Sequence, residues 1–292
     1  MKSGEIMQQI SEWEKDLSGV ITRGKDIMLD YQEYSKCYPF TNERLKDLTA
    51  LIDKENINNA LCVLSSGDHA FNLIYHGIID IDTFDCNIVT DYYALGFKKT
   101  AIECLTYQQF LYFFFNEPLN YKEIENYVIS CLPEKYQNFW QNYIYYLAEI
   151  HKKSIGVFGL LGFVDNYMQE NNNYLSSEQD YKQLQKNLLN AKINFKKMTI
   201  KDIYHQKEHY DLIMLSNILQ AMKKPLFGNP LNIANKIYKQ NLKDNGEMIY
   251  LYEFFDNELL GKKEMVIERT PKHENIKYIL DGSYAISKKK SR

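Results

Sequence analysis

One stretch decides the fold of this chain: Leu61-Cys62-Val63-Leu64-Ser65-Ser66-Gly67-Asp68-His69-Ala70. Four apolar residues run into a turn of small residues, and residues 71–77 then have the pattern of a short helix that ends at a glycine. A buried strand followed by a tight turn and a helix N-terminus forms a site for a polar, partly charged ligand. The stretch therefore predicts the first strand of an α/β domain, with a ligand crevice at its end.

A second apolar run, residues 79–84, ends in Asp85, which lies 18 residues after Gly67. In βαβ units that bind nucleosides, an acidic residue about 20 residues beyond the glycine turn accepts hydrogen bonds from ribose hydroxyls at the tip of the second strand. The turn has one glycine where the dinucleotide fingerprint has three, and this disfavours an NAD(P) dehydrogenase. An ordinary strand–turn–helix of an α/β core remains the alternative to a nucleoside site.

Four segments resemble the betaine-lipid-synthase-like proteins, which transfer the 3-amino-3-carboxypropyl group of S-adenosylmethionine (SAM). They are SSGDHAFN (residues 65–72), FDCN (84–87), ALGFKKTAI (94–102) and LTYQQF (105–110), and the good match covers about residues 60–115. A weaker similarity to class I SAM enzymes continues over residues 210–250. The resemblance implies a Rossmann-like, doubly wound class I SAM-transferase sheet, SAM as cofactor, and a small-molecule or lipid acceptor. The acceptor itself stays open, because the acceptor region matches least.

Residues that bind the cofactor are predicted at the turn, at the tip of the second strand and at the ends of two later strands. Asp202 follows an expected strand over residues 193–198, and its side chain is predicted either to meet the adenine amino group or to cap a helix. The next strand, over residues 210–217, delivers its last two side chains to the edge where open α/β sheets bind ligands. The full set is Ser65, Ser66, Gly67, Asp68, Asp85, Asn87, Asp202, Ser216 and Asn217.

The candidate catalytic bases are Asp68, His69 and Tyr92, because they lie near the turn and on the helix that follows the second strand. His69 has a second interpretation, as a hydrogen-bonding residue at the start of a helix. The favoured reaction is attack on the methionyl γ-carbon of SAM, which releases methylthioadenosine. In this reaction the protein mainly aligns the acceptor with the γ-carbon and sets the local electric field. A methyltransferase is the second enzymatic hypothesis, and a non-catalytic SAM- or nucleotide-binding module is the alternative of another class.

Hydrophobic periodicity predicts an N-terminal helical segment over residues 1–57, followed by the α/β domain over residues 58–292. The first segment has a helical pattern over residues 5–35 and a second helix over 45–52. Its aromatic stretch, residues 34–43, is expected either to lie across the cofactor or to cover the sheet.

A helical insertion is expected at about residues 106–190, where it would shape the acceptor pocket. Thr106 and Gln109 have the spacing of a capping box at the start of its first helix. Residues 154–163 contain three glycines among mostly apolar residues, and we interpret them as a lid or as a helix-packing segment. After the insertion, a strand over 247–254 and two strand-like runs, 263–270 and 277–287, predict the antiparallel hairpin that completes a SAM-transferase sheet.

Composition excludes several function classes. The 292 residues are 45% hydrophobic, enough for a sizeable core, and the net charge of −3 argues against a general nucleic-acid binder. The five cysteines have neither C-x-x-C nor paired Cys/His spacing, so reduced thiols in a cytoplasmic protein and no metal site are expected. The first residues do not have the pattern of a signal peptide, and the sequence contains no apolar run of 18 residues, so no transmembrane segment is predicted. The oligomeric state stays open.

Overall fold

The computed structural model describes residues 10–23, 34–35, 37–50, 52–115, 121–151, 160–161, 167–221, 230–251, 276–280 and 284–289. Two compact units divide the chain: a helical unit (residues 1–40 and 87–166) and a sheet unit (residues 41–86 and 167–292). This partition differs from the predicted boundaries. Residues 41–57 belong to the sheet unit instead of an N-terminal helical segment, and the helical unit already begins at residue 87 instead of about 106.

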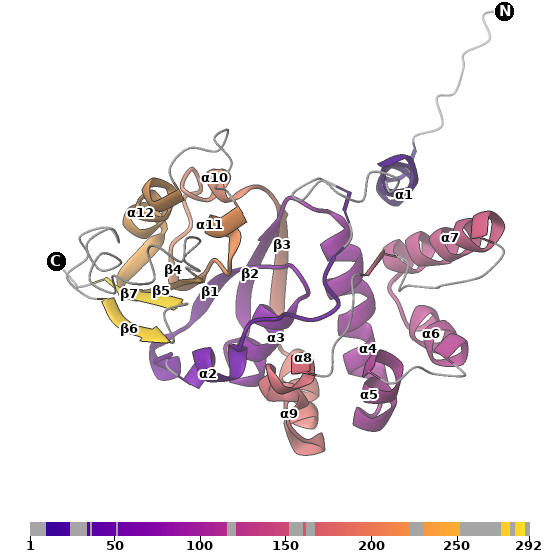
Figure 1. Ribbon diagram of the computed structural model, residues 1–292, viewed down its shortest axis with the longest axis horizontal. Helices are drawn as coiled ribbons and strands as arrows, with labels where there is room; N and C mark the ends of the chain where they lie inside the picture. The colour runs from indigo at the N-terminus through magenta and orange to yellow at the C-terminus, as the bar shows by residue number, and fades with distance from the viewer. Residues whose placement is uncertain are drawn as a thin grey trace, which may run out of the picture. The chain divides into compact units, whose positions relative to one another are not determined.

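The sheet unit contains a seven-stranded sheet of order β3-β2-β1-β4-β5-β7-β6 (Figure 1). Five adjacent strands of this sheet run parallel to one another: β1 (Asn59–Val63), β2 (Asp80–Asp85), β3 (Lys192–Lys197), β4 (Tyr210–Met214) and β5 (Leu242–Leu251). An antiparallel hairpin of β6 (Ile276–Leu280) and β7 (Tyr284–Lys288) continues the sheet beside β5. The order of the five parallel strands is that of a doubly wound, Rossmann-like sheet, so the predicted α/β class is confirmed at this level.

The strand order reverses between β1 and β4, because the chain runs outward through β2 and β3 and then returns to the other side of β1. The parallel register pairs Ala60 with Leu212 and Cys62 with Met214, so both strands end at the same edge of the sheet. We call this edge, formed by the residues that follow β1, β2 and β4, the carboxyl edge. In open α/β sheets, ligands bind at such an edge where the strand order reverses.

Helices cover both faces of this sheet (Figure 1). On one side, α2 (Leu45–Ala50) and α9 (Glu178–Leu188) contact α3 (Asp68–Tyr75). On the other side, α12 (Pro230–Asn241) contacts both α10 (Ile200–Ile203) and α11 (Ile218–Ala221). A strand that is covered on both faces must be apolar at every position, and the side chains from Ala60 to Leu64 are indeed all buried. Short elements complete the unit: α8 (Tyr167–Glu170) and 3-10 turns at Lys54–Asn56 and Asn173–Leu175.

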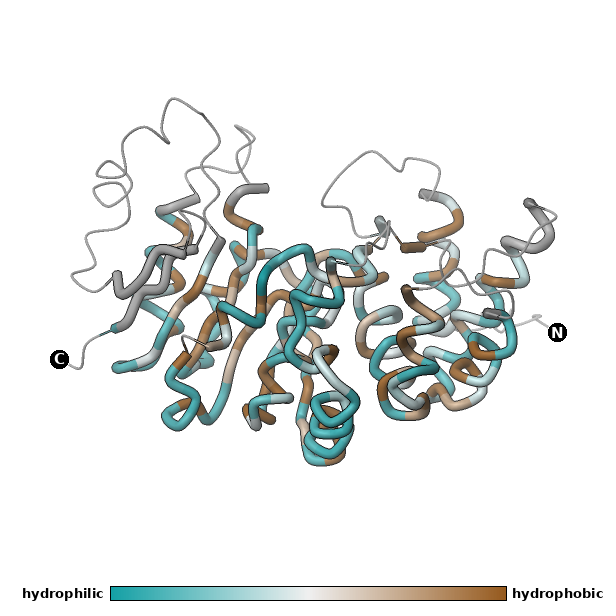
Figure 2. The backbone as a smooth tube through the Cα atoms, turned by 60° about the horizontal axis from the view of Figure 1, so that its bottom comes forward, coloured by the Kyte–Doolittle hydropathy of each residue, from teal (hydrophilic) through white to brown (hydrophobic). Residues whose placement is uncertain are grey.

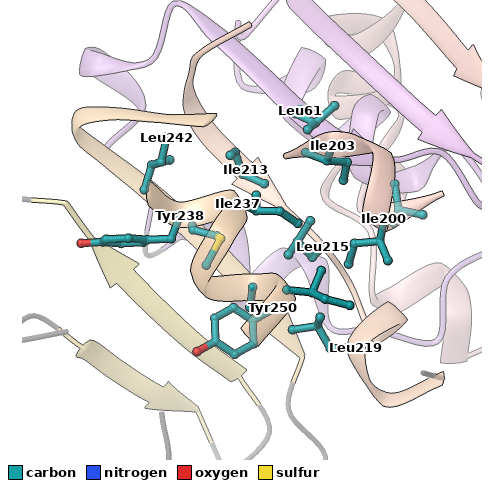
Figure 3. Packing of buried hydrophobic residues seen from close by; sticks show 14 of the residues in the cluster. Leu61, Ile200, Ile203, Ile213, Leu215, Leu219, Ile237, Tyr238, Leu242 and Tyr250 are labelled. Carbon is teal, nitrogen blue, oxygen red and sulfur yellow. The ribbon is translucent and has the colours of Figure 1, made fainter. Parts of the chain in front are cut away.

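The core on the second side is built from strand and helix residues that are far apart in the chain (Figure 3). Ile213 and Leu215, at the end of β4, pack with Ile237 of α12 and Ile203 of α10. All four side chains are at most 1% exposed, so they are removed from water almost completely. Because each such side chain contributes about 1.5–3 kcal/mol on burial, this packing holds β4 in place beside β1.

The helical unit contains α1 (Glu12–Arg23), a π-helix (Asp91–Lys98), α4 (Lys99–Cys104), α5 (Tyr107–Phe115), α6 (Tyr121–Ser130) and α7 (Glu134–His151). The predicted capping box opens α5: the Thr106 amide donates to Gln109 Oε1 at 2.9 Å, and the Gln109 amide donates to Thr106 Oγ1 at 3.3 Å. Hydrophobic and hydrophilic stretches alternate along the helices, as expected of amphipathic helices that bury one side (Figure 2).

Several other predictions fall partly or wholly outside the described residues. Of the helix expected over residues 5–35, residues 12–23 are described as α1, residues 5–9 and 24–33 lie outside the described residues, and Tyr34 and Ser35 are not helical. Of the segment 154–163 only Leu160 and Leu161 are described, and the strand-like run 263–270 is not. The expected hairpin is present, but both of its strands lie between residues 276 and 288. Within the described residues, no helix is long and apolar enough to cross a membrane.

Candidate functional site

The turn after β1 has an unusual backbone conformation. Gly67 has a φ of 83°, and Ser65 has a φ of 44° although it carries a side chain. Glycine adopts such angles freely, whereas a serine there is strained, and strained non-glycine residues concentrate at functional sites. The Phe71 amide donates to the Gly67 carbonyl oxygen at 3.0 Å, so α3 starts directly from the turn. The sequence therefore forms the predicted strand, turn and helix in the predicted order.

Asp85 ends β2 beside this turn. Its Oδ2 accepts a hydrogen bond from the Ser65 amide at 3.1 Å, and its side chain is half-buried. Backbone bonds fix the same region, because the Leu64 amide donates to the Phe84 carbonyl oxygen at 2.9 Å. The structure thus brings Ser65 and Asp85 together at the carboxyl edge, as the spacing predicts.

Asp68 is an internal anchor. Its carboxylate is fully buried and accepts hydrogen bonds from the Thr41 amide at 2.6 Å, the Ser66 hydroxyl at 2.8 Å and the Tyr174 hydroxyl at 2.6 Å. A buried carboxylate needs such donors, because an unsatisfied one would be costly. Asp68 therefore ties the chain before β1 and the 3-10 turn at Tyr174 to the start of α3, and its contacts are those of a structural group.

A second buried carboxylate, Glu43, lies beside His69 and Ser216. The Ser216 hydroxyl donates to Glu43 Oε1, and His69 Nε2 lies 3.2 Å from Glu43 Oε2. The exposed fractions are 5% for Glu43, 2% for His69 and 8% for Ser216. Ser216 has a φ of 51°, so the residue at the end of β4 shares the strained conformation of Ser65. We refer to Glu43, His69 and Ser216 as the Glu43 cluster.

Glu43 was not predicted from the sequence. It belongs to the segment 34–43, for which a position across the cofactor was one of two expectations, but no periodicity or motif marks the residue itself. The segment is held locally, because the Glu43 amide donates to Thr41 Oγ1 at 3.0 Å and the Leu45 amide to the Glu43 carbonyl oxygen at 2.9 Å. Only the fold reveals that this carboxylate contacts both the first turn of α3 and the residues that follow β4.

Asp202 and Asn217 have different surroundings. Asp202 Oδ2 accepts from the Thr199 amide at 2.8 Å and from the Thr199 hydroxyl at 2.7 Å, which is the capping box of α10. Of the two interpretations of Asp202, the helix cap is the one that the structure contains. Asn217 is exposed and directly follows Ser216 at the carboxyl edge.

Asn87 and Tyr92 belong to the helical unit. The Asn87 side chain donates to the Ser35 carbonyl oxygen at 3.0 Å and accepts from the Ser35 amide at 3.2 Å. The Tyr92 hydroxyl donates to Asp16 Oδ2 at 2.8 Å, and the ring stacks on Phe139 with centroids 3.9 Å apart. Burial, and to a smaller extent the hydrogen bond to Asp16 and its charge, raises the pKa of Tyr92 far above its ordinary value. The phenol therefore stays protonated near neutral pH and is a poor base there. These contacts of Asn87 and Tyr92 thus stabilise the helical unit.

A pocket of about 440 Å³ lies at the opposite edge of the sheet unit, where β1 and β4 begin. Its lining includes the acidic residues Asp53, Asp211, Asp244 and Glu247. Asp211 is ion-paired with Lys243 at 3.1 Å, and its carboxylate also accepts the Asn58 and Asn59 amides. None of the predicted site residues lines this pocket.

Comparison with known proteins adds no identification: no protein-family model matches the chain, and no curated protein matches it.

Proposed function

We propose that this protein is a SAM-dependent transferase that binds its cofactor at the carboxyl edge of the sheet unit. The observation that carries the proposal is the pair of strained serines at the point of strand-order reversal: Ser65 after β1 and Ser216 after β4 both have positive φ. Backbone strain at the two strand ends that flank the expected crevice is typical of a ligand site. The antiparallel hairpin beyond β5 agrees with the sheet that the family resemblance implies.

Two parts of SAM, the ribose and the methionyl carboxylate, have a matching group in this proposal. Asp85, at the tip of β2, accepts hydrogen bonds from the ribose hydroxyls, the role of the acidic residue in nucleoside-binding βαβ units. The first turn of α3 offers the positive end of a helix dipole to the methionyl carboxylate. Ser65, Ser66 and Gly67 are small residues, as expected where a ligand lies close to the backbone after a strand.

The reaction that we favour is transfer of the 3-amino-3-carboxypropyl group. A nucleophile of the acceptor forms a bond to the γ-carbon of SAM, the bond from that carbon to sulfur breaks, and its electron pair stays on sulfur in methylthioadenosine. This choice rests on the resemblance of residues 94–102 and 105–110 to the aminocarboxypropyl-transferring family. The acceptor is a small molecule or a lipid that loses a proton to a base, and His69, which contacts Glu43 beside Ser216, is the candidate base that we favour.

The test is to identify the nucleoside that the protein releases from SAM in the presence of a cell extract. We expect methylthioadenosine, with a label on the aminocarboxypropyl carbons recovered in the acceptor. S-adenosylhomocysteine with transfer of a methyl label would indicate a methyltransferase instead. Release of neither nucleoside above the level of an Asp85→Ala control would contradict transferase activity, and SAM binding without release would indicate a binding module.

A further inference from the structure

Two cysteines from different helices meet in the helical unit. Cys104 is the last residue of α4, and Cys131 directly follows α6. The two helices contact each other, and the Cys104 and Cys131 side chains are in hydrogen-bond contact. Both residues are free thiols in this structure. The fold of the helical unit therefore pairs two thiols that no C-x-x-C spacing marks in the sequence.

The ends of the two helices hold these cysteines in place. The Cys131 amide donates to the Val128 carbonyl oxygen at 3.0 Å, which continues the hydrogen bonding of α6 to this residue. Each cysteine is followed by a buried leucine: Leu105 is 2% exposed and Leu132 is 6% exposed. Because the backbone beside each thiol is fixed, Cys104 faces Cys131 at an effective concentration far above that of a thiol in solution.

The two thiols differ in exposure and in acidity. Cys131 is exposed and Cys104 is half-buried, whereas Cys37 and Cys62 are buried. Burial, and to a smaller extent the Cys131 thiol beside it, raises the pKa of Cys104 well above its ordinary value. Because the thiolate is the reactive form of a cysteine, Cys104 is a poor first nucleophile. The exposed Cys131 is therefore the thiol that reacts first with a reagent from solution.

A metal site is the other common use of neighbouring thiols. Zinc takes four ligands in structural sites and three protein ligands in catalytic sites. In the part of the chain that the structure describes, no group of three or more histidine, cysteine, aspartate or glutamate side chains could hold a metal ion. Two paired thiols without further ligands are suited to a disulfide instead, and in reducing compartments such bonds are usually transient and redox-sensing.

We propose that Cys104 and Cys131 are a thiol modification site, which a low-molecular-weight disulfide oxidises to a reversible disulfide between α4 and α6. Cys131 gives up its proton and attacks one sulfur of the small disulfide, whose S–S bond breaks, and the released thiolate takes up a proton. Cys104 then gives up its proton and attacks Cys131 Sγ, and the second small thiolate leaves and is protonated. Both cysteines are oxidised, and one small disulfide is reduced to two thiols. This inference is independent of the proposed function.

The first step also prepares the second. A small thiol bound to Cys131 removes the negative charge that this residue can carry and its thiol hydrogen, and both the charge and the hydrogen bond of Cys131 contribute to the raised pKa of Cys104. Cys104 therefore ionises more readily after Cys131 has reacted than before. The exposed cysteine acts as the attacking thiol, and the half-buried one as the resolving thiol.

Oxidised glutathione is the probe that tests this order. The full chain is incubated with it, the remaining thiols are alkylated, and the peptides are identified by mass spectrometry. We expect a Cys104–Cys131 disulfide in the wild type, with less than about a tenth of the Cys131–glutathione adduct that accumulates in Cys104→Ser, because the intramolecular thiol displaces glutathione. Cys131→Ser should leave Cys104 mostly unmodified. Cys86→Ser, the same change at the half-buried cysteine of the sheet unit, is the matched control and should behave as the wild type does.

Reduced glutathione in excess should restore both thiols in the wild type. A wild type that stays reduced in oxidised glutathione, keeps glutathione on Cys131, or links two chains through Cys131 would overturn the site. Equal amounts of adduct in Cys104→Ser and Cys131→Ser would overturn the order of attack. A denatured wild type should lose the preference for the Cys104–Cys131 bond, and an equally selective bond there would contradict pairing by the fold. If a variant does not fold, the native and denatured wild type decide, because they need no substitution.

Discussion

Replacing Asp85 by alanine tests the nucleoside site most specifically. The change removes the carboxylate that accepts the Ser65 amide at 3.1 Å and that, in the proposed complex, accepts the ribose hydroxyls. Hydrogen bonds to a charged group contribute about 1.5–3 kcal/mol, and every 1.4 kcal/mol is a factor of ten in affinity. We therefore expect the Kd for SAM to rise about 10- to 150-fold from a value in the micromolar range that is usual for metabolites.

The matched control is Asp80→Ala, which makes the same change at the exposed opposite end of β2. Calorimetry should give a Kd for this variant within about twofold of the wild-type value, since a surface substitution away from the site changes little. Thermal unfolding separates a binding effect from a folding effect, because Asp85→Ala also loses the contact with Ser65. Equal SAM affinity of the wild type and a folded Asp85→Ala variant would refute the ribose role of Asp85.

Three further changes probe the turn, the pH dependence and a helix start. Gly67→Val forces a β-branched side chain to a φ of 83°, which we expect to cost about 1–2 kcal/mol and to lower SAM affinity more than tenfold; a folded variant with wild-type affinity would count against the turn. Burial, and to a smaller extent the charge of Lys54, lowers the pKa of His76 from 6.5 to about 4. Between pH 4 and pH 6.5, this histidine is therefore protonated in the unfolded chain but not in the native protein. The free energy of unfolding should therefore fall as the pH drops from 6.5 toward 4, and His76→Gln should flatten a denaturant-measured profile; an equally steep profile in the variant would disagree. Thr106→Ala removes the capping box of α5, and we expect a lower melting temperature from a loss of about 1 kcal/mol, whereas an unchanged melting temperature would mean that the cap contributes nothing.

Local signals predicted the parts of the fold that depend on neighbouring residues. The run into Gly67 predicts strand, turn and helix because the apolar residues need burial and the glycine permits a positive φ. Thr106 with Gln109 marks a helix start through contacts only three residues apart. Capping also explains Asp202, whose side chain satisfies its own helix.

The Glu43 cluster could not be predicted in this way, because its partners are distant in the chain. Glu43 meets His69 across 26 residues and Ser216 across 173, and Asp68 meets Tyr174 across 106. Helical periodicity likewise says which residues form a helix but not which unit it joins, so residues 87–105 were expected in the α/β domain and lie in the helical unit. Such long-range contacts depend on the whole fold and leave no trace in local spacing.

Hydrogen exchange of the wild type with and without SAM tests most directly whether the cofactor binds at the carboxyl edge. We expect SAM to slow exchange in residues 64–68, 85–86 and 215–217, which follow β1, β2 and β4, and to leave the peptides around the acidic pocket at residues 211 and 244–247 unchanged. No change in the first three segments, or protection confined to the acidic pocket, would contradict a SAM site at the carboxyl edge.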